Sequence, residues 1–274
     1  MSRHELLIAD SRFMLALQPD SIHLVVTSPP YWNIKDYEYP GQIGTGQDYQ
    51  QYLCSLAQVL KECCRTIHPG CRMAINIGDQ YIRASATERY HIVPVPSDII
   101  GLSAGLQLDF LGQIIWRKIS TTKTSGGGAW MGSTYWPRDG QITYEHEYIL
   151  IFKKPGAAPK PSAEAKDRSK LTKEQRSAWF RGVWDDIRPT RQDRHPAAFP
   201  LELPRRLIKM YSFWGETVLD PFVGSGPTMV AAAQEGRNSV GYEINPAYLP
   251  VVQSRFHEEA GSDTELTCVY SGLE

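Results

Sequence analysis

Residues 22–32, IHLVVTSPPYW, decide how this chain is built. The apolar run Ile22–Val26 is typical of a buried strand, and it stops at a polar pair followed by two prolines and two aromatic residues. Proline has no N–H and keeps the preceding residue out of the helical region, so the backbone stays extended and its carbonyls can accept hydrogen bonds. With the Ser28 hydroxyl and the faces of Tyr31 and Trp32, these carbonyls predict a slot for a planar amine such as a nucleobase edge.

A second turn, Asp220–Gly226 (DPFVGSG), follows a short apolar run near the other end of the chain. Gly224 and Gly226 let the backbone approach a ligand closely. Glu243 comes 19 positions after Gly224, the separation at which Rossmann-like folds place a carboxylate on a ribose diol. The turn lacks the Gly-Lys-Ser/Thr of nucleotide phosphate loops and the third glycine of the dinucleotide fingerprint. It therefore predicts a cofactor that has a ribose but no phosphate.

The two motifs, in this order, resemble those of the permuted (β-group) DNA methyltransferases that modify exocyclic amino groups. Residues 27–32 resemble their catalytic motif and residues 220–226 their S-adenosyl-L-methionine motif, and the likeness runs from the first strand to near Phe256. The resemblance implies an α/β, Rossmann-like methyltransferase fold. Such a fold has a mostly parallel sheet, an antiparallel edge hairpin (here within 106–117 and 143–153) and helices on both faces. It also implies S-adenosyl-L-methionine as cofactor and DNA as partner.

The same resemblance assigns site residues. The catalytic residues would be Ser28, Pro29, Pro30 and Tyr31. The cofactor residues would be Asp10, Thr27, His195, Phe199, Asp220, Pro221, Phe222, Gly224, Ser225, Gly226 and Glu243. Two of these have alternatives. Asp10 would lie near the adenine or cap a following helical piece. His195 is expected to line the methionine end or to have a structural role rather than to act as a base, since nothing pairs it with an orienting carboxylate.

Basic and aromatic residues point to DNA contacts. The whole chain has a net charge of −1, but residues 153–209 hold 15 Lys and Arg against 7 Asp and Glu, which suits phosphate binding. We expect one catalytic domain, 1–274, with DNA-contacting insertions at about 33–48, 119–141 and 155–194; a solvated linker is the alternative for the third, and a disordered connection for the second. The expected DNA-binding residues are Trp32, Lys118, Lys123, Trp130, Trp136 and Arg138.

The implied reaction moves the sulfonium methyl group to the exocyclic amine of a flipped base. Hydrogen bonds from the amine to Ser28 and the Pro29 carbonyl would aim its lone pair at the methyl carbon, while Tyr31 holds the ring. A serine at the first position resembles the cytosine-N4 enzymes, and adenine N6 is the alternative. A methyltransferase for RNA or another substrate, and a non-catalytic DNA-binding module, are further alternatives.

Composition narrows the class of protein. The chain has 274 residues with 42% hydrophobic residues, no apolar run long enough for a bilayer, and five cysteines, an odd number that favours reduced thiols. Cys64, His68 and Cys71 lack a recognised zinc pattern, so no metal is expected. We therefore expect the protein to be cytoplasmic and nucleoid-associated. A cognate restriction endonuclease and a second copy of the chain are partners to test.

The pattern of apolar residues and breakers predicts the order of elements. Strands are expected at 6–10, 22–26, 71–79, 106–117, 143–153, 216–220 and 237–241. Helices are expected at 11–17, 48–67 after the cap Asp48, 97–105, 201–211, 228–234 and from 245 onward.

Overall fold

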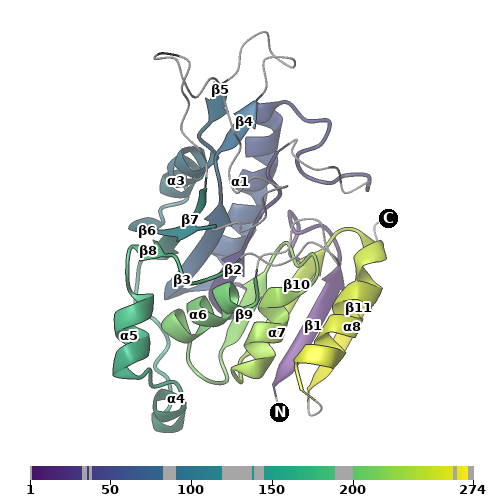
Figure 1. Ribbon diagram of the computed structural model, residues 1–274. Coiled ribbons are helices and arrows are strands. Elements are labelled where there is room, and N and C mark those ends of the chain that lie inside the picture. Colours follow the sequence, from purple (N-terminus) through teal and green to yellow (C-terminus); the bar gives the residue numbers. More distant parts are fainter. Residues whose placement is uncertain are drawn as a thin grey trace.

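The computed structural model describes residues 2–32, 36, 39–82, 91–118, 138, 145–188, 200–261 and 264–270. Their main feature is a nine-stranded sheet (Figure 1). In spatial order its strands are β11 (Glu265–Tyr270), β1 (Arg3–Ile8), β10 (Asn238–Glu243), β9 (Thr217–Asp220), β2 (Ile22–Thr27), β3 (Ile67–Ile77), β7 (His146–Lys153), β6 (Asp109–Arg117) and β8 (Val183–Trp184).

The sheet is mostly parallel, which confirms the predicted fold class. Every neighbouring pair from β11 to β3 is parallel. β7 runs antiparallel to β3, and β6 runs antiparallel to β7, so these two strands form the expected hairpin. The two-residue β8 pairs outside it, parallel to β6.

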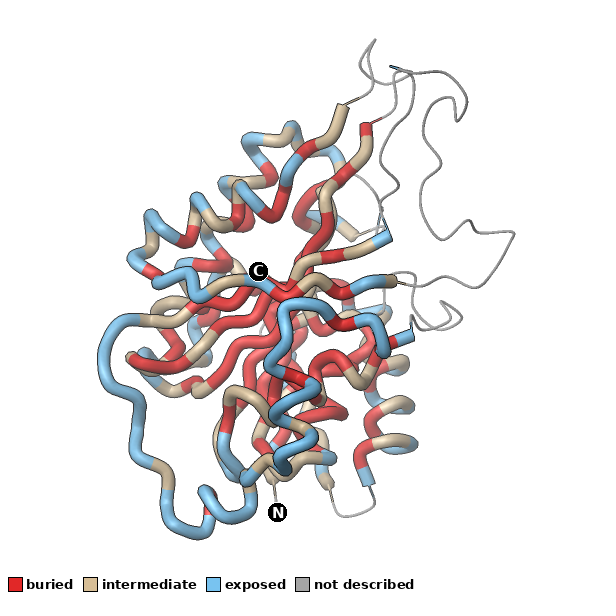
Figure 2. The backbone as a smooth tube through the Cα atoms, turned by 60° about the vertical axis from the view of Figure 1, so that its left-hand side comes forward, coloured by how far each residue is buried: buried red, intermediate tan, exposed pale blue. Residues whose placement is uncertain are grey.

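Helices cover both faces of the sheet because successive strand residues point to opposite sides. Val25 packs in the cluster that holds Tyr52 and Leu56 of α1, whereas its neighbours Leu24 and Val26 pack with α6 and α7. Figure 2 shows the buried strands at the centre and exposed residues on the outer turns of the helices. The helices are α1 (Tyr49–Thr66), α3 (Val95–Gly105), α4 (Ala163–Arg168), α5 (Lys173–Trp179), α6 (Glu202–Tyr211), α7 (Pro227–Gln234), η1 (Pro246–Tyr248) and α8 (Leu249–Glu259). A separate antiparallel pair, β4 (Gln80–Ile82) and β5 (His91–Val93), follows β3.

Local signals were reliable where they were strong. Asp48 is the N-cap of α1 and forms the full capping box with Gln51, and Asn245 caps η1. Several boundaries differ by a few residues. β1 begins at Arg3 and ends at Ile8, and β3 begins at Ile67 rather than at 71 and ends at Ile77 rather than at 79. β6 begins at Asp109 rather than at 106, β10 extends to Glu243, and α3 begins at Val95 rather than at 97.

The helix predicted at 11–17 is wrong, because this segment forms successive turns. The Arg65 guanidinium donates to the carbonyls of Met14 and Leu17, each at 2.9 Å. The Asp10 carboxylate meanwhile accepts the backbone N–H of Arg12 at 2.9 Å. Carbonyls that an arginine side chain binds are not available to a helix ladder, so tertiary contacts override the local pattern.

The start of the third predicted insertion lies at an unexpected edge of the sheet. β7 is antiparallel to β3, and its last residue, Lys153, pairs with Arg72, so the chain leaves β7 toward the amino ends of the parallel strands. There α4 and α5 form after the N-caps Ser162 and Thr172. Figure 1 shows both helices at the end of the molecule where the N-terminus lies, away from β4 and β5. The part with α4 and α5 is therefore remote from the carboxyl edge, where ligands bind in such sheets. The chain then returns to that edge, because Trp184 of β8 pairs with Trp116 near the carboxyl end of β6.

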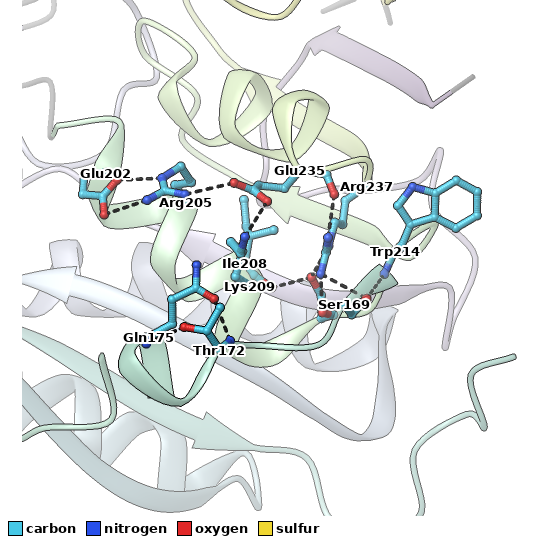
Figure 3. A network of polar contacts seen from close by, with 11 residues as sticks. Ser169, Thr172, Gln175, Glu202, Arg205, Ile208, Lys209, Trp214, Glu235 and Arg237 are labelled. Carbon is cyan, nitrogen blue, oxygen red and sulfur yellow. Dashed lines mark hydrogen bonds and ion pairs between the residues drawn. The ribbon is translucent and has the colours of Figure 1, made fainter. Parts of the chain in front are cut away.

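A polar network fastens this segment to the sheet (Figure 3). Ser169 accepts the N–H of Trp214 at 2.6 Å. The buried guanidinium of Arg237 donates to the Ser212 carbonyl at 2.7 Å and to the Glu235 carbonyl at 2.5 Å, and it also reaches the Ser169 hydroxyl at 3.4 Å.

Among the helices described, none combines the length and the apolar composition that a membrane crossing requires.

Candidate active site

The register of the sheet brings the two motif turns together. β2 and β9 are neighbours and parallel, with Leu24 opposite Val218 and Val25 opposite Leu219, so both strands end at the same edge. The Thr27 hydroxyl donates to Oδ1 of Asp220 at 2.8 Å, and both residues are buried. The proline turn and the glycine turn therefore adjoin, as strand ends must at a ligand-binding edge.

The proline turn is held from below by α1. The Tyr52 hydroxyl donates to the Pro30 carbonyl at 2.9 Å. The sequence predicted this carbonyl as a free acceptor, but it already accepts a hydrogen bond from the protein. The Trp32 indole N–H donates to the Gln47 carbonyl at 2.9 Å, and its ring meets Tyr49 edge-on at 5.1 Å. Trp32, expected to contact DNA, thus also anchors the turn to the start of α1.

A buried carboxylate stands beside the turn and was missed from the sequence. Glu147 begins β7 and is 8% exposed. Its Oε2 accepts from Asn76 Nδ2 at 2.7 Å, and the same Nδ2 lies 3.4 Å from the Tyr31 hydroxyl. Its Oε1 binds the ammonium of Lys118. Lys118 is therefore paired inside the protein, which makes it a weaker candidate for a phosphate contact than its charge suggested.

The sequence did carry a faint signal for this cluster. Asn76 and Glu147 are polar residues within apolar strand patterns, INI and HEYILIF, and a buried polar side chain in such a strand needs a partner. Gly78 is the third member: a Cβ there would lie 3.2 Å from Cγ of Glu147 and 3.7 Å from the Tyr31 ring. The absence of a side chain at Gly78 lets these two residues approach each other.

The glycine turn uses its backbone donors internally. Phe222 N–H donates to Asp220 at 3.0 Å, Val223 N–H to the Tyr242 carbonyl at 3.0 Å, and Gly224 N–H to Oε2 of Glu243 at 2.9 Å. These N–H groups are thus not available to a phosphate, which would need them. The turn fits a cofactor with hydroxyl and amino donors better than one with phosphates.

Two buried acids lie under the turn. Burial raises the pKa of Asp220 to about 6, although hydrogen bonds from Thr228, Phe222 and Thr27 oppose the shift. Burial likewise raises the pKa of Glu243 to about 7, against hydrogen bonds from the backbone at 244, 245 and 224 and with a smaller contribution from Asp220. Both acids would gain from a cationic or hydroxyl-bearing ligand that favours their charged form. The acid at position 243 stands at the end of β10, as the spacing predicted.

Asp220 is less accessible than expected. Its Oδ1 accepts from Thr27 and Phe222, while Oδ2 is buried beside Thr228. Its hydrogen bonds link the end of β2 and the glycine turn to the end of β9. Direct contact between this carboxylate and a cofactor amino group would require an opening that the described geometry does not have.

The other predicted residues are distributed as follows. Asp10 pairs with Arg12, whose guanidinium lies 2.5–3.0 Å from its carboxylate. Ser225 is buried and accepts from Arg255 of α8 at 3.0 Å. Arg138 is exposed. Five predicted site residues lie outside the described residues: His195, Phe199, Lys123, Trp130 and Trp136.

Known proteins resemble this chain over most of its length. A family model described as DNA methylase matches residues 22–254. A Type II methyltransferase of Methanocaldococcus jannaschii, M.MjaI, is 33% identical over 93% of this chain and 91% of its own length. Another, M.MthZI of Methanothermobacter thermautotrophicus, is 37% identical over 96% of this chain and 79% of its own length.

Solved structures agree with the fold. A putative DNA modification methylase of Thermus thermophilus, TTHA0409, crystallised with S-adenosyl-L-methionine, is 37% identical, has a TM-score of 0.82, and aligns over 99% of this chain and 100% of its own. The cytosine-N4-specific PvuII DNA methyltransferase has a TM-score of 0.63 at 17% identity, over 97% of this chain and 89% of its own. At that identity the likeness concerns the fold alone.

Proposed function

This chain belongs to the DNA methylase family, and we propose that it moves the methyl group of S-adenosyl-L-methionine to the N4 amino group of a flipped cytosine in DNA. At the coarser level it is a Type II DNA methyltransferase of the N6/N4 class that uses this cofactor. The choice of cytosine over adenine, and the roles of single residues, are the proposed part.

One observation supports the proposal most strongly. The hydrogen bond between Thr27 and Asp220 joins the last residue of β2 to the last residue of β9. An acceptor slot at Ser28–Tyr31 and a donor slot at the glycine turn are then direct neighbours, which group transfer between two bound molecules requires.

Different residues of the chain would bind the cofactor and the target base. When bound, S-adenosyl-L-methionine supplies an electrophilic methyl group. Glu243 would accept hydroxyl groups of its ribose, in keeping with the position of this acid at the end of β10. Ser28 and the Pro29 carbonyl would accept the two N–H groups of the target amine, whose lone pair is otherwise delocalised into the ring. Pro29 accepts no hydrogen bond from the described part of the chain, which suits this role.

The base assignment rests on Ser28. A serine at the first position of the catalytic motif resembles the cytosine-N4 enzymes, whereas adenine N6 is the alternative. Both bases present a donor amine beside an acceptor ring nitrogen, so the turn alone supports either. The variable loops would select between them.

The whole chain would act as one catalytic domain, with insertions at 33–48 and 119–141 contacting DNA. For 155–194, α4 and α5 lie at the other edge of the sheet (Figure 1). A DNA contact is therefore proposed for the part from β8 onward, which lies beside the carboxyl end of β6. Because its substrate is DNA, we place the enzyme in the nucleoid-associated cytoplasm. A cognate restriction endonuclease and a homodimer are additional proposals.

The test is nucleoside mass spectrometry of DNA treated with the protein and isotopically labelled cofactor. Labelled N4-methylcytosine is the expected product, and N6-methyladenine would support the alternative base. Methylation of single-stranded RNA but not of DNA would overturn the DNA assignment. Binding of duplex DNA without cofactor binding or turnover would instead identify a non-catalytic module.

A further inference from the structure

The buried carboxylate of Glu147 serves no role in the reaction described so far. It lies where three chain segments converge: the start of β7, the residue after β6 (Lys118) and the end of β3 (Asn76 and Gly78). Both of its oxygens are hydrogen-bonded, one to Asn76 and one to Lys118. Bringing a charged group out of water is costly unless it is paired, so the site is built to keep a carboxylate here.

This carboxylate faces the catalytic turn. Asn76 contacts both Oε2 of Glu147, at 2.7 Å, and the Tyr31 hydroxyl, at 3.4 Å. Gly78 leaves room for Tyr31 and Glu147 side by side. Because Asn76 donates an N–H to the Tyr31 oxygen, the single hydroxyl hydrogen of Tyr31 is left for another acceptor. Glu147, which binds the same Asn76 amide and approaches Tyr31 at Gly78, is the carboxylate placed to accept it.

The Ser28 hydroxyl is the next group in this chain of polar side chains. Burial, and then the charge of Glu147, raise the pKa of Tyr31 well above its usual range, while a hydrogen bond from Ser28 opposes the shift. Tyr31 is therefore a neutral phenol, which in the relay would accept from Ser28 and donate to Glu147. A serine hydroxyl has one hydrogen, and donating it to Tyr31 leaves the Ser28 oxygen as an acceptor. This orientation is the one required to receive an N–H of a target amine.

We propose that Glu147 is the final acceptor of the proton that the target amine loses, reached through the hydroxyls of Ser28 and Tyr31. The inference rests on the proposed amine methylation and holds for cytosine N4 and adenine N6 alike. Glu147 does not touch the base, so we describe it as a positioning and proton-accepting residue rather than a catalytic one.

The proton count of the reaction requires such an acceptor. The amine nitrogen forms a bond to the methyl carbon as the carbon–sulfur bond breaks, and its electron pair stays on sulfur. The nitrogen then carries a positive charge and must release one proton. That proton passes to the Ser28 oxygen, the Ser28 proton to the Tyr31 oxygen, and the Tyr31 proton to Glu147. The products are a neutral methylated amine, unchanged hydroxyls and a protonated carboxyl.

The surroundings of Glu147 suit this role. Lys118 is the cation that faces it, and Tyr31 is the other titratable group in contact. His146, next in sequence, instead bonds to the Tyr148 hydroxyl at 3.0 Å. Asp79, at the end of β3, has His146 as its electrostatic partner. The hydroxyl chain thus ends at one carboxylate among the described residues.

The experiment is a single-turnover measurement of methyl transfer to DNA across pH, with Glu147→Gln compared with the wild type. Glutamine keeps an oxygen for Asn76 but cannot take up the proton. We expect at least a tenfold lower rate, an unchanged cofactor Kd and loss of the fall in rate that the wild type shows at low pH. Glu145→Gln is the matched control, because Glu145 is exposed and paired with Arg117; it should behave as the wild type.

Two further variants keep the inference testable if Glu147→Gln folds poorly. Lys118→Met removes the neighbouring cation, and a carboxylate without it holds a proton more tightly, so the inflection of the rate profile should move to higher pH. Tyr31→Phe should abolish any added effect of Glu147→Gln, because the chain is already broken. An unshifted profile in Lys118→Met, or a Glu147→Gln profile like that of the wild type, would overturn the relay. A wild type that methylates no DNA amine would overturn the proposed function instead.

Discussion

The hydroxyl of Thr27 donates a 2.8 Å hydrogen bond to Oδ1 of Asp220, a residue 193 positions away in sequence. This bond is the direct link between the proline turn and the glycine turn. Since Asp220 is fully buried and its pKa is raised by burial to about 6, each donor that it keeps matters to both stability and the geometry of the site.

Thr27→Val should remove that donor while keeping the shape of the side chain. Leaving a buried acceptor short of a partner costs about 1–3 kcal/mol, so we expect the free energy of unfolding in urea to fall by that amount. Thr27→Ser retains the hydroxyl and is the control. Equal stabilities for the valine and serine variants would show that the bond does not stabilise the pair of turns.

Ser28→Ala should lower turnover by roughly 10²-fold, in the range of a positioned proton-transfer group, and should leave the cofactor Kd nearly unchanged. The reason is that Ser28 would face the target amine in the proposed site, whereas the cofactor would lie at the glycine turn. Calorimetry and single-turnover rates measure the two quantities separately. Parallel losses in both would refute the assignment of Ser28 to the acceptor.

Cofactor binding should strengthen as pH rises from about 6 to 8. The free protein holds Glu243 with a pKa near 7 because of burial, and ribose hydroxyls need the charged form as acceptor, so protonation at low pH weakens binding. Binding should therefore release protons, which calorimetry in buffers of different ionisation enthalpy detects. Glu243→Gln should bind more weakly and lose most of this dependence; a pH-independent wild-type Kd contradicts the prediction.

Stability should fall with acid because of His4. This residue is buried between Ser239 and Ser2, each hydroxyl 2.8 Å from a ring nitrogen, and burial lowers its pKa to about 4. The unfolded chain protonates His4 near pH 6.5, so it binds more protons than the folded protein between pH 6.5 and 4, and the free energy of unfolding drops across that window.

Burial raises the pKa values of Asp220 and Glu243, so their protonation increases the free energy of unfolding over part of that range. The measurement is therefore the difference between the wild type and His4→Gln in urea unfolding at pH 7.5 and pH 5. The difference should shrink at the lower pH. His257→Gln, at an exposed position of α8, should show no such change, and a constant difference for His4→Gln would refute the argument.

Arg237→Met should loosen the segment that carries α4 and α5. Its guanidinium satisfies the buried carbonyl of Ser212 and the partly buried carbonyl of Glu235, and losing it should cost at least about 2 kcal/mol. Limited proteolysis within 155–188 should speed up, while methylation by the folded fraction should persist because this edge is remote from the motif turns. Arg168→Met is the control: this residue is half exposed, is paired with Glu164 and stacks on Trp214, so it should cost less than about 1 kcal/mol. Equal cleavage rates would contradict the role of Arg237.

Much of the fold and the site followed from short stretches of sequence. Strand patterns, the Asp48 capping box and the two motif turns depend on the backbone preferences of neighbouring residues, and the parallel sheet follows from alternating strands and helices. The position of Glu243 at the end of β10 could likewise be predicted from spacing alone. Segment 11–17 shows the limit of this reasoning, since Arg65, distant in sequence, binds the carbonyls that a helix would need.

Tertiary structure alone decided which charged groups meet. Lys118 pairs with Glu147 because β6 and β7 are antiparallel, so that the end of β6 lies opposite the start of β7. No local pattern links those two residues. The direction of β7 also sends the chain after Lys153, with α4 and α5, to the edge opposite the site. Local sequence sets the conformation of a strand, but the partner of a side chain depends on strand order and direction, which are settled by burial across the whole sheet.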